Sequence, residues 1–77
     1  MNLLSIGGSD PSSGAGIQSD LRTFSTDNVH WLTVITAITA QNTLKFGKVE
    51  PVSIDILKNQ LQLVFSDFKI DGIKIGM

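Results

Sequence analysis

The pattern of apolar and polar positions predicts short strands that alternate with loops and helices. Residues 3–7 form a short apolar run ending in two glycines, which is typical of a buried strand leading into a turn. Residues 31–39 are nearly all apolar and rich in β-branched side chains. A continuous pattern of this kind is typical of a central strand covered on both faces in a parallel sheet. We therefore expect residues 31–39 to form such a strand.

Two segments carry apolar side chains at helical spacing. Ile17, Leu21 and Phe24 recur at intervals of four and three residues, which predicts a first amphipathic helix. Residues 53–67 predict a second helix, with Ser53 as its N-cap. The apolar positions of this second segment repeat at helical spacing and are expected to face the sheet: Ile54, Leu57, Leu61, Val64, Phe65 and Phe68.

Two further segments complete the predicted order of elements. Residues 45–52 hold a short extended segment around Val49 that Pro51 stops, and residues 73–76 form a last strand. The order β-α-β-(β)-α-β predicts an α/β fold with a mainly parallel sheet and right-handed crossovers. Two helices are too few to cover both faces of such a sheet. We therefore expect residues 1–77 to form a single partial domain, the first third of a doubly wound fold.

Composition narrows the classes of function. The chain has 77 residues, no cysteine and a formal net charge of -1, and its six basic residues are scattered. This distribution does not predict the basic patch that a nucleic-acid-binding protein needs. No apolar stretch approaches the roughly 20 residues needed to cross a bilayer, so we expect no membrane partner and a cytoplasmic location. His30 lacks a second ligand at a useful spacing, so no metal site is expected.

A loop rich in glycine and serine follows the first predicted strand. Residues 7–20, GGSDPSSGAGIQSD, open the first helix, where backbone N–H groups can hold a polar or anionic ligand. The segment lacks the Gly-Lys-Ser/Thr of a P-loop and the third glycine of a dinucleotide fingerprint. Both a ligand-binding loop and a tight turn fit this pattern. Asp20 would likewise either accept a bond from a ligand hydroxyl or complement the helix dipole.

Polar residues at the ends of two strands are further candidates for ligand binding. Gln41 and Asn42 follow the central strand, at the carboxyl edge where open α/β sheets bind ligands. An amide offers a donor and an acceptor together, which suits a heteroaromatic ring with amino and ring-nitrogen groups. A polar loop without a ligand fits equally. Lys74 is either a phosphate ligand at a strand end or a lysine that extends to solvent from a sheet edge.

Three strings, in this order and at these separations, carry a family resemblance: IGGSDPSSGAGIQSDLRTFS, VITAITAQNT and FSDFKIDGIKIGM. They closely resemble the hydroxymethylpyrimidine/phosphomethylpyrimidine kinases of the ribokinase superfamily. The resemblance implies the N-terminal part of a ribokinase-like α/β/α sandwich. It also implies an ATP-dependent phosphotransferase of thiamine biosynthesis, which phosphorylates 4-amino-5-hydroxymethyl-2-methylpyrimidine and then its monophosphate.

The resemblance also implies substrate-binding residues. Carried over by position, they are Gly8, Ala15, Asp20, Gln41 and Met77. Asp20 and Gln41 would bond the amino and hydroxymethyl groups and the ring nitrogens. Gly8 and Ala15 would allow close approach to the ring, and Met77 would pack on it. Ser13 departs from the pattern, because the family usually has glycine there.

Length is the larger departure, since members of the family are several times longer. Phosphoryl transfer needs a nucleotide cradle, Mg²⁺ and a base for the attacking hydroxyl. In the family, the sites for ATP and Mg²⁺ and the catalytic residue lie downstream of the segment matched here. We therefore expect no catalytic, cofactor-binding or metal-binding residue in this chain, and no activity of the chain alone.

Two alternatives remain open beside a small-molecule pyrimidine kinase. The first is a fragment of a pyridoxine or pyridoxal kinase, because related enzymes share the sandwich and some accept both rings. The second is a non-catalytic binding module that retains only the small-molecule site. Full-length relatives often form homodimers, so a homodimer is a further expectation for the longer protein.

Overall fold

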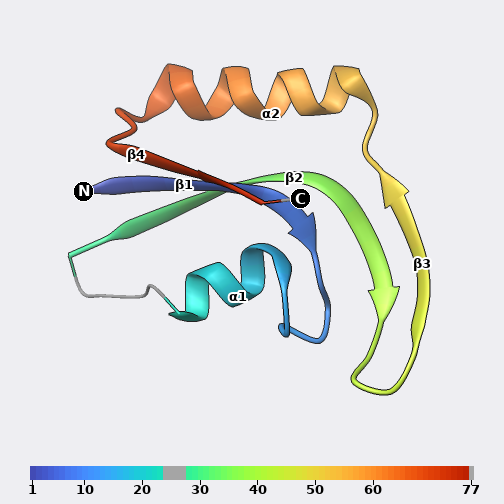
Figure 1. The fold of residues 1–77 in the computed structure, drawn as a ribbon. Coiled ribbons are helices and arrows are strands. Elements are labelled where there is room, and N and C mark those ends of the chain that lie inside the picture. The colour runs from blue at the N-terminus through green and yellow to red at the C-terminus, as the bar shows by residue number, and fades with distance from the viewer. Residues whose placement is uncertain (24–27, 77) are drawn as a thin grey trace.

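The computed structural model describes residues 1–23 and 28–76. Over these residues the elements follow the predicted order (Figure 1). Their bounds are β1 (Asn2–Ser9), α1 (Gly16–Thr23), β2 (His30–Gln41), β3 (Phe46–Pro51), α2 (Ile54–Asp67) and β4 (Gly72–Ile75). Phe24, the last position of the first predicted stripe, lies outside the described residues, whereas Ile17 is buried and Leu21 half-buried on α1.

The four strands form one sheet in the order β3-β2-β1-β4. β1 pairs in parallel with both β2 and β4, and β3 pairs antiparallel with β2. The prediction of a mainly parallel sheet is therefore confirmed. The carboxyl ends of β1, β2 and β4 point toward the same edge of the sheet, where the β1–α1 loop also begins.

The two helices lie on opposite faces of the sheet, which gives three layers (Figure 1). α1 packs on β1 and β2, and α2 packs on β2. The carboxyl half of β2 bends away from these layers together with β3, so that the β2–β3 hairpin extends beyond both helices (Figure 1). Within the described ranges, neither α1 nor α2 has the length and apolar character to cross a membrane.

The hydrophobic core is small. Among the described residues, the buried apolar side chains are Leu4, Ile17 and Val34. The expectation that residues 31–39 are covered on both faces was wrong, because only Val34 is buried and Ile38 is 59% exposed. The reason is geometric: two helices cover only the first part of β2, and the strand then leaves the helical layers with the hairpin.

The second helix begins as predicted but presents a narrower apolar face. Ser53 is the N-cap, and its side chain accepts a hydrogen bond from the backbone N–H of Ile56. Four positions of the predicted stripe are half-buried: Leu57, Leu61, Val64 and Phe68. Ile54 and Phe65 are 65% and 49% exposed, which corrects the prediction for these two. At 3.6 residues per turn both lie at the flank of the stripe, beyond the part that meets the sheet.

β2 contains one extra residue relative to β1. Gly7 pairs with Ile35, but Ser9 pairs with Ile38, so two steps along β1 correspond to three steps along β2. Such a bulge bends the strand and takes up the extra residue, so that the pairing with β1 resumes beyond it. The backbone N–H of Val52 donates to the carbonyl of Thr36 at 2.9 Å, which holds the bulged segment from the side of β3.

Candidate functional site

The β1–α1 loop is organised around the carboxylate of Asp10, which is only 4% exposed. Its Oδ1 accepts from the backbone N–H of Ser12 at 2.8 Å and from the Ser12 hydroxyl at 2.7 Å. Its Oδ2 accepts from the N–H of Ala15 at 2.9 Å. The bond from the Ser12 side chain, together with the backbone donors and against the effect of burial, lowers the pKa of Asp10 below its usual value. The loop therefore satisfies its own N–H groups around a charged residue.

A close backbone contact joins the end of β1 to the start of α1. Gly16 has φ +67°, and a Cβ at this position would lie 2.3 Å from the carbonyl oxygen of Gly8. Only glycine accommodates both the left-handed conformation and this approach. Gly8 and the segment containing Ala15 are consequently brought together, as the resemblance implies for a shared site. Ser13 also has a positive φ, 64°, although it carries a side chain.

A chain of hydrogen bonds links the same loop to the end of β2. The Gln18 side chain bridges Asp10 and Ser9, accepting from the Asp10 N–H at 2.8 Å and donating to Ser9 Oγ at 2.8 Å. Thr39 Oγ1 donates to the carbonyl oxygen of Ser9 at 2.8 Å. Gln41 Nε2 in turn donates to Thr39 Oγ1 at 2.9 Å. The carboxamide of Gln41 is therefore connected to the β1–α1 loop through Thr39.

Gln41 also lines an open hollow of about 370 Å³ on the β2–β3 hairpin, together with Ala40, Asn42, Lys45 and Gly47. Asn42 has a structural role there, because its Oδ1 accepts from the N–H groups of Leu44 and Lys45 at 2.9 and 2.8 Å. Asn42 thus closes the turn of the hairpin, whereas the Gln41 amide contacts Thr39. Gln41 is the one of the two amides that these hydrogen bonds connect to the β1–α1 region.

The side chain of Asp20 is buried, whereas Gln41 is half-buried and Asn42 is exposed. Its Oδ2 accepts from the Ser5 hydroxyl at 2.9 Å, and its Oδ1 pairs with the ammonium of Lys74. The hydrogen bond from Lys74 lowers the pKa of Asp20, and the bond from Ser5 adds to this against the effect of burial. Ser5 precedes Gly8 by three residues, or about 10 Å of strand. The carboxylate therefore ties α1 to the middle of β1 and β4.

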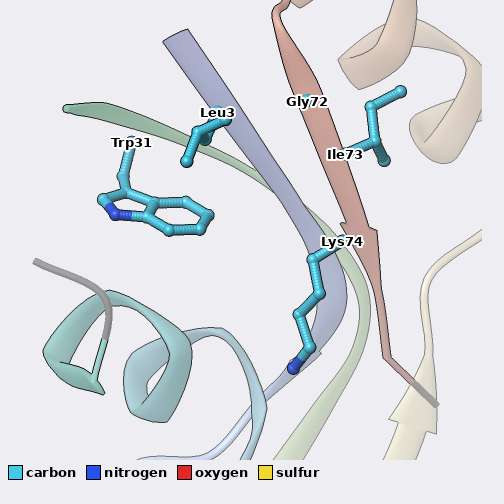
Figure 2. A pocket seen from close by; sticks show the side chains of 5 residues that line it. All are labelled: Leu3, Trp31, Gly72, Ile73 and Lys74. Atoms are coloured by element: carbon cyan, nitrogen blue, oxygen red, sulfur yellow. The ribbon is translucent and has the colours of Figure 1, made fainter. Parts of the chain in front are cut away.

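A second hollow, of about 220 Å³, lies toward the other end of the sheet (Figure 2). Leu3, Trp31, Gly72, Ile73 and Lys74 line it. Lys74 extends from β4 toward α1, while Ile73 points to the opposite side of the strand (Figure 2). Lys74 thus forms an ion pair with Asp20. The sequence predicted either a phosphate ligand or a lysine that extends to solvent, and it did not indicate this ion pair. The walls are mostly apolar and include none of the predicted substrate residues.

The structure brings Gly8, Ala15 and Gln41 to one edge of the sheet, and it places Asp20 further inside. Met77 lies outside the described residues. The ligand roles of all five remain predictions. Sequence reasoning missed Ser9, Gln18 and Thr39, which connect the site. Thr39 carried a usable signal, because a residue two positions before Gln41 on a strand shares its face.

Comparison with known proteins finds one family over most of the chain. The family model described as phosphomethylpyrimidine kinase matches residues 10–77. The hydroxymethylpyrimidine/phosphomethylpyrimidine kinase of Rhizobium meliloti is 55% identical over 74 residues, which cover 96% of this chain and 28% of that protein. The kinase of the same name from Escherichia coli is 51% identical over 77 residues, covering 100% of this chain and 29% of that protein. The chain thus spans under a third of the length of these relatives.

Solved structures give the same fold. A crystal structure of phosphomethylpyrimidine kinase from Clostridium difficile superposes with a TM-score of 0.93 at 49% identity, covering 100% of this chain and 33% of that one. An ADP complex of Bacillus subtilis pyridoxal kinase superposes with a TM-score of 0.85 at 38% identity, covering 99% of this chain and 29% of that one. The predicted ribokinase-like fold is therefore confirmed for this chain.

Proposed function

Because this chain belongs to the phosphomethylpyrimidine kinase family, we propose that it forms the pyrimidine-binding part of a hydroxymethylpyrimidine/phosphomethylpyrimidine kinase of thiamine biosynthesis. The whole enzyme would transfer the γ-phosphoryl group of ATP to the hydroxymethyl oxygen of 4-amino-5-hydroxymethyl-2-methylpyrimidine, and then phosphorylate the monophosphate. The observation that carries this proposal is the carboxamide of Gln41, connected through Thr39 to the carbonyl of Ser9, which lies between Gly8 and the loop that contains Ala15.

Each site residue has a proposed task that fits its surroundings. Gln41 would bond the polar edge of the ring, and Gly8 and Ala15 would leave room for the ring beside the backbone. Asp20 is a weaker candidate for direct contact, because both of its oxygens already accept a hydrogen bond inside the fold. Met77 is proposed to pack on the ring.

The β1–α1 loop is poorly suited to bind the phosphates of a nucleotide. The N–H groups of Ser12 and Ala15 are bonded to the Asp10 carboxylate, and that of Ser13 to the Asp10 carbonyl. The loop therefore offers phosphate oxygens no free row of donors, and it places a negative charge where they would approach. We propose that ATP and Mg²⁺ are held by segments that the relatives carry beyond the matched portion, so this chain alone does not turn over. A cytoplasmic location and a homodimer stay predictions.

A pyridoxal kinase is the second candidate, favoured by the similarity to the pyridoxal kinase of Bacillus subtilis at 38% identity. Both rings are heteroaromatic six-membered rings of similar size. The two candidates differ in the polar groups that meet Gln41. The aminopyrimidine presents a donor beside a ring-nitrogen acceptor, which a single carboxamide matches with its oxygen and its N–H.

Titration of the purified chain with the hydroxymethylpyrimidine, and separately with pyridoxal, tests the proposal. We expect the pyrimidine to bind more tightly, and Gln41→Ala to weaken its binding about tenfold, as expected for one lost hydrogen bond. Gln62→Ala, at an exposed position of α2, is the matched control and should leave the affinity unchanged. Tighter binding of pyridoxal would favour the second candidate. Binding with no Gln41 dependence would contradict the proposed site, and ATP-dependent turnover would contradict the claim that catalysis needs other segments.

A further inference from the structure

We propose that Thr39 is a positioning residue that fixes which end of the Gln41 carboxamide faces the ligand, and so makes the site selective for a ring with an amino group. The inference rests on the proposed function of this site. Two consecutive hydrogen bonds carry the inference through their direction. They link the Ser9 carbonyl, the Thr39 hydroxyl and the Gln41 amide.

The direction of this relay follows from what each group can do. A carbonyl oxygen only accepts, so the single hydrogen of the Thr39 hydroxyl points to the oxygen of Ser9, 2.8 Å away. Thr39 Oγ1 can then only accept from Gln41, and its neighbour at 2.9 Å must be the nitrogen Nε2. A flipped amide would set two acceptors against each other. The network therefore turns Oε1 of Gln41 away from Thr39.

The relay is anchored at its far end. Ser9 pairs with Ile38 in the parallel ladder, and its hydroxyl accepts from the Gln18 side chain at 2.8 Å. Gln18 also accepts from the backbone N–H of Asp10 at 2.8 Å. Both Thr39 and Gln41 are half-buried, which limits competition from water. The carbonyl that sets the direction of the relay is consequently held by the fold on both sides.

The chemical consequence is selectivity between ligands of similar shape. With Nε2 held by Thr39, Gln41 offers its Oε1 as an acceptor and the second N–H of Nε2 as a donor. A 4-aminopyrimidine matches this pair, because its amino group donates and its adjacent ring nitrogen accepts. The 4-oxo counterpart reverses both groups and matches only the flipped amide, which the Thr39 hydroxyl disfavours. A site built on directed hydrogen bonds discriminates by leaving the wrong partner unpaired.

The test compares the affinities of the chain for the 4-amino and 4-oxo forms of 5-hydroxymethyl-2-methylpyrimidine. Thr39→Val removes the hydroxyl at nearly constant shape and should lower the preference for the amino form about tenfold. Thr39→Ser keeps the hydroxyl and should keep the preference. A merely structural role would weaken both ligands equally, so an unchanged ratio in Thr39→Val would overturn the proposal. Circular dichroism checks that each variant is folded.

A second measurement separates this inference from the proposed function. If the wild-type chain binds neither ligand, the proposed function of this chain fails, and the exchange of the Gln41 side-chain amide protons, followed by NMR, decides the role of Thr39. We expect the Gln41 side-chain amide protons to exchange slowly in the wild type and in Thr39→Ser. In Thr39→Val they should exchange faster. Equal exchange in the wild type and Thr39→Val would overturn the assignment of Thr39.

Discussion

The side-chain carboxamide of Gln60 is hydrogen-bonded to both backbone polar atoms of Ile35. Its Nε2 donates to the Ile35 carbonyl at 2.8 Å, and its Oε1 accepts from the Ile35 N–H at 2.9 Å. Ile35 is the residue of β2 at which the ladder with β1 shifts register, and pairing with β3 begins only at Ala37. Gln60 thus occupies the place that a neighbouring strand would otherwise fill.

Replacing Gln60 tests this link between helix and sheet. Gln60→Glu keeps the size of the side chain but removes its donor, which leaves the Ile35 carbonyl without that bond. We expect a loss of about 1–2 kcal/mol in the free energy of unfolding, measured by urea titration, because a carboxylate oxygen would face the Ile35 carbonyl oxygen in place of the donor. Gln62→Glu makes the same change at an exposed position of α2 and serves as the control. Equal unfolding midpoints for the two variants would contradict the role of Gln60.

Ser13 is predicted to be a site of local strain. It adopts φ 64°, a region that costs residues with a Cβ about 1 kcal/mol and that glycine enters freely. Ser13→Gly should therefore raise the free energy of unfolding, by up to about 1 kcal/mol after the greater entropy of the unfolded chain is counted. Ser13→Ala removes the hydroxyl but keeps the Cβ, and it should give no gain. A similar gain in both variants would show that the hydroxyl, rather than the backbone conformation, is the cause.

Gly16 is predicted to be the least replaceable glycine of the loop. In Gly16→Ala the new Cβ would lie 2.3 Å from the Gly8 carbonyl oxygen, at φ +67°, so β1 and α1 would have to separate. We expect a destabilisation of about 3 kcal/mol or more, together with weaker pyrimidine binding. Gly14→Ala is the matched control, since the nearest atoms would lie at 3.7 and 3.8 Å. Comparable stability of the two variants would disprove the close contact.

The ion pair between Asp20 and Lys74 predicts an acid-sensitive contribution to stability. The pKa of Asp20 is lowered from its ordinary value of 3.8, mainly by the hydrogen bond from Lys74. A lowered pKa in the folded state stabilises above the ordinary value, and the contribution disappears as the pH falls through the lowered pKa. Asp20→Asn should therefore be less stable than the wild type at pH 7, by about 1–3 kcal/mol, and the difference should shrink in acid.

Urea titrations across this pH range provide the measurement. Asp67→Asn, at an exposed position of the last turn of α2, is the control for losing one carboxylate elsewhere. A difference between wild type and Asp20→Asn that stays constant down to the acid limit would mean that the side chain stabilises the fold by packing rather than by charge.

Local sequence signals predicted the elements well. Ser53 and the apolar repeat after it gave the start of α2, and the β-branched run at residues 31–39 gave β2 within a few residues. These signals depend on neighbours along the chain, which the sequence displays directly. The ribokinase-like arrangement came from the resemblance, since propensity alone does not order four strands in a sheet.

Contacts between distant segments could not be predicted in the same way. Asp20 and Lys74 are 54 positions apart, and each had a satisfactory local explanation before the structure joined them. Burial failed for a related reason: Ile38 and Phe65 are apolar, but their exposure depends on what lies over each face. Thr39 looked like an ordinary strand residue, and only the direction of its hydrogen bond revealed its connection to Gln41.

The extra residue in β2 separates the pairing of the strand from its direction. Gly7 pairs with Ile35 and Ser9 with Ile38, so a chain lacking one residue between Ile35 and Ile38 would keep both pairs in a regular ladder, with Thr39 and Gln41 on their present face. Such a chain would lose the bend that the bulge gives to β2, and with it the direction in which the β2–β3 hairpin leaves the helical layers. The extra residue therefore orients the hairpin without deciding which layer receives the amide.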